Sequence, residues 1–149
     1  MVAYRLKNTV SLNGSVTRGI CSIESGYLSD VKETYSIVVD GNGVISDAEC
    51  GVLDGELPVS MNMWGFGADI FCDMQNEFDA FLRNIKQGDI NAEYALPTMV
   101  DNLIKSNRLK IDVLTTDSVW FGVTYREDRA YVADELKKLH ENSTYPEKL

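Results

Sequence analysis

The hydrophobic pattern changes along this chain from strand-like runs to helical spacing, and that change limits the folds available to it. Val16–Ile23 and Tyr27–Ile37 have the composition of two strands, and Glu24–Gly26 between them is typical of a hairpin turn. A second hairpin is predicted around Asp40–Gly43, where Asn-Gly readily takes the positive φ values of a tight turn. The early part of the chain therefore favours antiparallel strand pairing.

Helices and crossover strands are predicted for the later part of the chain. Apolar residues recur at helical spacing over residues 70–85, and a second helix is expected to begin near Pro97. Leu109–Thr115 and Val119–Tyr125 alternate as strands, and Arg126–Glu141 is predicted to be an amphipathic helix. Because hairpins come first and crossovers later, we expect an α/β fold in which helices pack on a mixed sheet.

Val59–Phe66 is predicted to be a strand with two unlike faces, because side chains alternate along a strand. One face is apolar and is expected to pack against helices, whereas the other carries a hydroxyl, an amide and an indole. The apolar face comprises Val59, Met61, Met63 and Gly65, and the other comprises Ser60, Asn62, Trp64 and Phe66. The spacing leaves two interpretations open: a site for a polar, ring-shaped ligand, or an ordinary sheet face under a loop.

Length and charge narrow the class of protein. The 149 residues suit a single domain over 1–149, with a frayed polar tail at 142–149. The formal net charge of −9, from 23 acidic and 14 basic residues, argues against nucleic acid as a partner. No apolar run approaches the roughly 20 residues that span a bilayer, so no membrane association is expected.

The cysteines and the absence of phosphate-binding motifs limit the kinds of functional site that the sequence predicts. Cys21, Cys50 and Cys72 show no CxxC spacing, which indicates reduced thiols in a cytoplasmic protein. Each is more typical of a small apolar packing residue than of a nucleophile. The sequence contains neither GxxxxGK(S/T) nor GxGxxG, and its one histidine, His140, is expected at a solvated helix end. Composition and spacing alone therefore indicate only a soluble cytoplasmic α/β domain.

Six short segments, taken in order, carry a resemblance to a known family. They are YRLKNT (Tyr4–Thr9), NGSVTRGIC (Asn13–Cys21), VKET (Val31–Thr34), VSMNMWGF (Val59–Phe66), AEYALPTMVDNLI (Ala92–Ile104) and VWFGVTYRED (Val119–Asp128). Together they resemble the C-terminal half of bacterial sugar-phosphate nucleotidyltransferases, the superfamily of glucose-1-phosphate uridylyl- and thymidylyltransferases. Their order and spacing extend over nearly the whole chain, and they are most similar to a subgroup of clostridial-type members.

The resemblance implies a Rossmann-like nucleotide-diphospho-sugar transferase fold and transfer of a nucleotidyl group from a nucleoside triphosphate (NTP) to a sugar 1-phosphate. Pyrophosphate is released, and Mg²⁺ is the cofactor of the full-length enzyme. The family's Gly-rich triphosphate loop and one metal-binding Asp belong to an N-terminal half that this sequence does not contain. We therefore expect a C-terminal fragment that is inactive alone and does not hold Mg²⁺ by itself.

Two further expectations stand beside this one. The alternative function is a non-catalytic, regulatory domain that binds a nucleotide sugar or a protein. Homo-oligomerisation is also expected if truncation exposes a sheet edge, because an open strand edge can pair with a second copy.

The resemblance also implies which residues bind the substrate. Gly19 matches a family glycine whose backbone approaches the sugar, and a bulge in an edge strand is the alternative interpretation. Glu33 matches the family glutamate that accepts hydrogen bonds from sugar hydroxyls, and a solvated strand carboxylate is its alternative. Asn62 and Trp64 match the strand that forms the floor beside the sugar, and Trp120 matches a family tryptophan. No catalytic residue and no metal ligand is assigned.

Two positions depart from the family pattern. Thr34 stands where the family often has a Lys that binds the phosphate of the sugar, and Lys32 or Arg18 is a nearby substitute for it. Gly122 stands where many members have a metal-binding Asp. These departures weaken the expectation of a phosphate contact at residue 34 and of a metal-binding carboxylate at residue 122.

Overall fold

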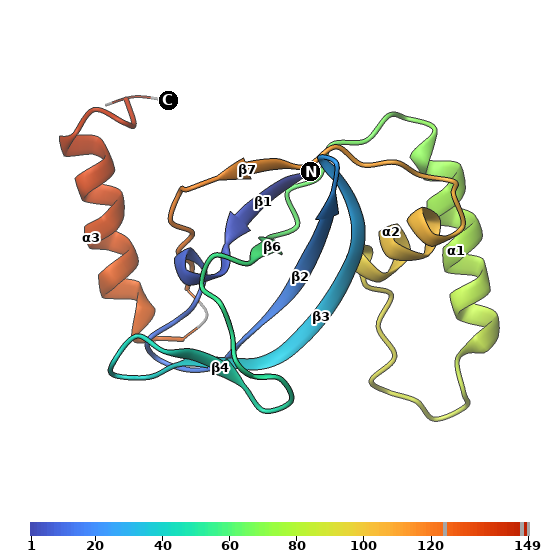
Figure 1. The fold of residues 1–149 in the computed structure, drawn as a ribbon, viewed down its shortest axis with the longest axis horizontal. Coiled ribbons are helices and arrows are strands. Elements are labelled where there is room, and N and C mark those ends of the chain that lie inside the picture. Colours follow the sequence, from blue (N-terminus) through green and yellow to red (C-terminus); the bar gives the residue numbers. More distant parts are fainter. Residues whose placement is uncertain (124, 147, 149) are drawn as a thin grey trace.

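The computed structural model describes residues 1–123, 125–146 and 148, and in them the chain forms a mixed seven-stranded sheet with three α-helices (Figure 1). The strand order is β5-β4-β3-β2-β6-β1-β7. The strands are β1 (Val2–Arg5), β2 (Val16–Glu24), β3 (Tyr27–Val39), β4 (Ile45–Asp47), β5 (Gly51–Val52), β6 (Pro58–Ser60) and β7 (Leu114–Thr116). The helices are the 3-10 turn η1 (Leu6–Asn8), α1 (Ile70–Asn84), α2 (Leu96–Lys105) and α3 (Asp128–Glu141). The predicted mixed α/β class is confirmed.

β2 and β3 form one long antiparallel hairpin, as the sequence predicts. Its register starts with Glu24 opposite Tyr27 at the turn and continues along both strands. Ser25 and Gly26 have φ of 52° and 83°, the positive values that a two-residue hairpin turn requires. β1 pairs antiparallel with β6 and parallel with β7, so the sheet is mixed.

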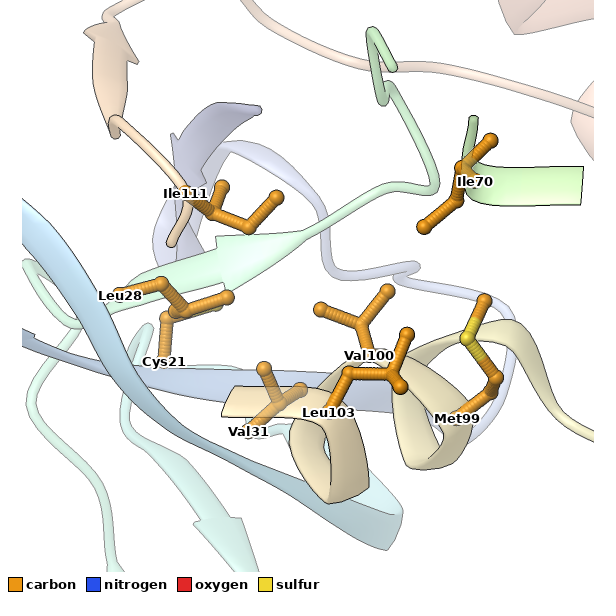
Figure 2. Close-up of a cluster of buried hydrophobic side chains, with 8 residues drawn as sticks. All are labelled: Cys21, Leu28, Val31, Ile70, Met99, Val100, Leu103 and Ile111. Carbon is orange, nitrogen blue, oxygen red and sulfur yellow. The ribbon is translucent and has the colours of Figure 1, made fainter. Parts of the chain in front are cut away.

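Helix α2 covers β3 on one face of the sheet, and an apolar cluster lies beneath it (Figures 1 and 2). Pro97 stands in the first turn of α2, where its missing N–H costs no helical hydrogen bond. Figure 2 shows the cluster, which we call the helix-side cluster: Cys21, Leu28, Val31, Ile70, Met99, Val100, Leu103 and Ile111. Two strands, two helices and the segment before β7 therefore share one core.

A polar contact fixes α2 on β3 beside this cluster. Asp101 Oδ1 accepts a hydrogen bond from the Val31 backbone N–H at 3.3 Å. Lys105 Nζ lies 2.8 Å from Asp30 Oδ1 and also pairs with Asp101. Because Asp101 is buried, satisfying its carboxylate requires this position of the helix along the strand.

The predicted Val59–Phe66 strand is wrong beyond Ser60. β6 ends there, and Asn62 takes a φ of 55°, a left-handed conformation that turns the chain away from the ladder. The face predicted to pack against helices does not do so. Val59 is buried in a second cluster, formed with strand and 3-10 residues on the opposite face, whereas Trp64 lies against the helix-side cluster.

Other boundaries also differ from the predictions. Leu109–Thr115 contributes only its end to β7, and residues 119–123 are not a strand; Thr124 of that predicted strand lies outside the described residues. The Trp120 N–H donates instead to the Asn8 carbonyl at 2.9 Å, at the 3-10 turn after β1. β1 and β5 were not predicted, because strands of four and two residues are too short to show alternation of apolar and polar side chains.

The three cysteines, each predicted to be a small packing residue, differ in burial. Burial raises the pKa of the Cys21 thiol to about 12, in keeping with its predicted packing role. Cys50 and Cys72 are exposed, so the same prediction is wrong for them.

In the part of the chain that the structure describes, no helix has the length and apolar content to cross a membrane.

Replacing Leu103 tests the helix-side cluster. Leu103 has no exposed surface, so Leu103→Ala is expected to lower the free energy of unfolding by about 2–5 kcal/mol, through lost burial and a residual cavity. Leu136 on α3 is 40% exposed, and Leu136→Ala is expected to cost less than about 1.5 kcal/mol. Urea denaturation measures both values. Equal losses would contradict the placement of α2 over the core.

Candidate functional site

Gly19, Glu33 and Ser60 occupy neighbouring positions on three adjacent strands. Gly19 on β2 lies opposite Glu33 on β3 and opposite Ser60 on β6. A Cβ added at Gly19 would lie 3.0 Å from Val31 Cγ1, 3.5 Å from Ser60 Cβ and 3.7 Å from Glu33 Oε1. Gly19 is itself buried, and its missing side chain lets the Val31, Ser60 and Glu33 side chains pack closely over the β2 backbone. Because β2 is a central strand, the edge-strand bulge considered for Gly19 is wrong.

The Glu33 carboxylate is half-buried and has no hydrogen-bond or ion-pair partner among the described residues. Burial raises its pKa, and the nearby Glu93 carboxylate raises that pKa further. Glu93 lies in the segment before α2, and no spacing in the sequence signals that it approaches Glu33. An acceptor that is partly desolvated and unpartnered is suited to hydroxyl or N–H donors of a ligand.

Asn62 and Trp64 continue this group of residues beyond the end of β6. The Asn62 N–H donates to Ser60 Oγ at 3.2 Å, and Trp64 Nε1–H donates to Asn62 Oδ1 at 3.3 Å. The Trp64 ring is stacked on Phe66, with 5.9 Å between centroids and 9° between planes. Four of the five predicted substrate-binding residues, all except Trp120, thus lie along one continuous path from Glu33 to the indole.

Trp120 is the predicted residue that the structure places apart. Arg18 and Gly19 are consecutive on β2, so their side chains leave opposite faces of the sheet. The Arg18 guanidinium carbon lies 5.2 Å from the centroid of the Trp120 ring. Trp120 therefore belongs to the Arg18 face, and the expected pairing of Trp120 with Trp64 in one site is not observed.

The residues considered for a phosphate contact also lie on the other face. Lys32 and Thr34 flank Glu33 on β3, so both side chains leave the face opposite to the Glu33 carboxylate. Thr34 is buried, and its hydroxyl donates to the Lys32 carbonyl at 3.4 Å. Arg18 pairs with Thr34 in the hairpin register and shares that face. None of these three side chains is placed to reach a phosphate held beside Glu33.

The residues near position 122 do not fit a Mg²⁺ ion. A Cβ added at Gly122 would lie 2.6 Å from Trp120 Cη2, so the indole fills the space in which a side chain would start. Within residues 1–123, 125–146 and 148, no group of three or more His, Cys, Asp or Glu residues is arranged to hold a metal ion. The second carboxylate that the family resemblance implies is therefore not supplied here.

Comparison with known proteins adds no family assignment. No family model matches the chain, and no curated protein matches it significantly. The resemblance to nucleotidyltransferases is therefore carried by the quoted segments between Tyr4 and Asp128 alone. Gly19, Glu33 and Ser60 lie in three of those segments. Their neighbouring positions in the sheet come from the structure and do not depend on the resemblance.

Adding a methyl group at Gly19 tests the close packing over β2. Gly19→Ala places its Cβ 3.0 Å from Val31 Cγ1, and the overpacking is expected to cost about 1–3 kcal/mol of unfolding free energy. Gly41→Ala is the matched control, because a Cβ there meets nothing within 4 Å. Thermal unfolding measures both variants. A Gly19→Ala protein as stable as Gly41→Ala would contradict the described contact.

The raised pKa of Glu33 predicts a pH-dependent gain in stability for Glu33→Gln. The unfolded chain releases this proton near the ordinary pKa of 4.5, whereas the folded chain keeps it to higher pH. Between these two pKa values the folded state binds more protons than the unfolded state, so the contribution of Glu33 to stability falls as pH rises. Glutamine carries no titratable proton, so the stability of the Glu33→Gln variant does not fall with pH for this reason.

Urea denaturation at several pH values from 4.5 upward measures this effect. The stability of Glu33→Gln relative to the unaltered protein is expected to increase with pH and then reach a plateau. A difference that stays constant or decreases with pH would show that the Glu33 carboxyl is not desolvated.

Proposed function

We propose that this chain is the sugar-1-phosphate-binding part of a nucleotidyltransferase with the Rossmann-like nucleotide-diphospho-sugar fold. The observation that carries the proposal is the half-buried Glu33 carboxylate beside Gly19 and Ser60, which has no partner among the residues that the structure describes. One carboxylate accepts hydrogen bonds from two neighbouring sugar hydroxyls. The Trp64 indole adds a flat apolar surface of the kind that lines small-molecule sites.

In this role the chain's own residues position the acceptor. Glu33 and Asn62 hold the sugar so that a phosphate oxygen faces the α-phosphorus of the NTP. That oxygen forms the new bond to phosphorus, and the bond to pyrophosphate breaks. Holding two reactants in line supplies much of the acceleration in such transfers, with little covalent work for side chains. The groups that hold the triphosphate are not among the residues of this sequence.

A specific observation favours a second candidate, a non-catalytic domain that binds a nucleotide sugar. Trp120 fills the space in which a metal-binding carboxylate at position 122 would begin, and Thr34 is buried where a phosphate-binding Lys is expected. Neither position supplies a phosphate or metal ligand beside Glu33, because both lie with Arg18 on the other face, while the Glu33 carboxylate keeps its capacity to accept from hydroxyl donors. Binding without transfer is the function that these residues would retain.

Calorimetry on this chain separates the two candidates. Glucose 1-phosphate, galactose 1-phosphate and mannose 1-phosphate are titrated first, followed by UDP-glucose and dTDP-glucose. Binding of a sugar 1-phosphate, weakened at least about tenfold by Glu33→Gln through loss of charged hydrogen bonds, supports the first candidate. Glu24→Gln is the matched control, since Glu24 is exposed at the far end of the same hairpin.

The remaining outcomes also decide between the proposals. Binding of a nucleotide sugar with no binding of any sugar 1-phosphate favours the non-catalytic domain. An equal loss in Glu33→Gln and Glu24→Gln would show that net charge, and not the Glu33 site, governs affinity. No binding of either ligand class, by a folded protein, would overturn both candidates.

A further inference from the structure

A cavity of about 330 Å³ lies on the sheet face that Glu33 does not occupy. The segment after β1, strand β2, residues 119–122 and the start of α3 line it. Trp120, Phe121 and Tyr131 line it together with aliphatic side chains, and Asn8 and Asn13 add amide groups. Its volume is at the lower end of the range for small-molecule sites, so it suits a ligand smaller than a nucleotide sugar.

Two cationic residues, Lys7 and Arg18, line this cavity. Lys7 pairs with Glu56, whereas part of the hydrogen-bonding capacity of Arg18 is unused. Nη1 donates to the Thr17 carbonyl at 2.8 Å, and Nη2 donates to the Thr9 carbonyl. Nε is buried and has no partner among the described residues. A buried N–H without an acceptor costs free energy that a suitable ligand atom would recover.

The Arg18 guanidinium is also partly desolvated. Burial lowers the pKa of the guanidinium, which shows that the charged form is partly desolvated. The face of Trp120 lies 5.2 Å away and offers only the weak stabilisation of a cation–π contact. The Asp128 carboxylate also lines this cavity, and it accepts hydrogen bonds from Asn13 Nδ2 at 2.7 Å and from the Tyr125 N–H at 2.8 Å.

We propose that this cavity is a second binding site, for an oxyanion carried on a small planar apolar body. The oxyanion accepts the free Nε–H of Arg18, and the planar body lies among Trp120, Phe121 and Tyr131. Guanidinium groups bind phosphate and carboxylate oxygens with strong, charge-assisted hydrogen bonds, so either anion satisfies the chemistry. The site is separate from the proposed sugar site, because consecutive residues of β2 direct Arg18 and Gly19 to opposite faces.

Phenyl phosphate is the probe that tests this site, and nuclear magnetic resonance of the arginine Nε–H groups is the direct readout. The Arg18 Nε–H signal, identified by its loss in Arg18→Gln, is expected to shift on titration and to saturate in the unaltered protein. Inorganic phosphate is expected to bind at least about tenfold more weakly, since it lacks the planar body. Benzyl alcohol, which has the ring and no anion, is expected to leave the signal unmoved.

Variants and a second anion complete the test. Calorimetry is expected to show at least a tenfold loss of phenyl phosphate affinity in Arg18→Gln. Arg83→Gln is the matched control, because it removes the same charge from an exposed position on α1. Benzoate, titrated in parallel, distinguishes a carboxylate ligand from a phosphate ligand, and tighter binding of either one supports the site.

Three results would overturn the proposal. The first is an Arg18 Nε–H signal in the unaltered protein that does not respond to either aryl anion. The second is equal affinity for phenyl phosphate and inorganic phosphate. The third is an equal loss of affinity in Arg83→Gln and Arg18→Gln. Because the first measurement uses the unaltered chain, it decides the matter even if Arg18→Gln does not fold.

Discussion

The antiparallel pairing of β2 with β3 is the constraint on which the rest of the molecule depends. Its inner face supplies Cys21 and Val31 to the cluster beneath α2, and its other face supplies Val16 and Ile37 to the second cluster. The Asp101 carboxylate fixes α2 to the backbone of β3, so the helix follows the hairpin. β6 pairs with β2 at Gly19 and Ile20, and β1 and β7 follow β6 in the strand order. The positions of β1 and β7 therefore also depend on β2.

The same hairpin divides the chemistry of the chain between two faces. Among the residues that the structure describes, the Glu33 carboxylate on one face and the Arg18 Nε–H on the other have no partner. Alternation along the strand is sufficient to separate them, because Arg18 directly precedes Gly19. The two groups therefore do not neutralise each other, and each remains available to a ligand of opposite polarity. Burial raises the cost of leaving either group without such a partner.

Local patterns predicted what depends on local interactions. The β2–β3 turn follows from the conformational freedom at Ser25 and Gly26, and the three α-helices follow from apolar spacing. The break in Val59–Phe66 was missed because alternation does not reveal the positive φ of Asn62. The contact of Gly19 with Glu33 depends on hairpin register, which bulges shift and spacing alone does not fix. Likewise, Trp120 matched a family motif, but its position depends on a backbone contact with distant Asn8.

The position of β1 has a consequence for how the chain assembles during synthesis. β1 lies between β6 and β7, and its residue Val2 is in register with Leu114. The β2–β3 hairpin needs only its own residues, whereas β1 gains its first neighbour after β6 has left the ribosome and its second after β7. An early strand with both edges open is exposed to pairing with other chains. Arg5 at the end of β1, and Lys7 just beyond it, place charge beside those edges during that interval.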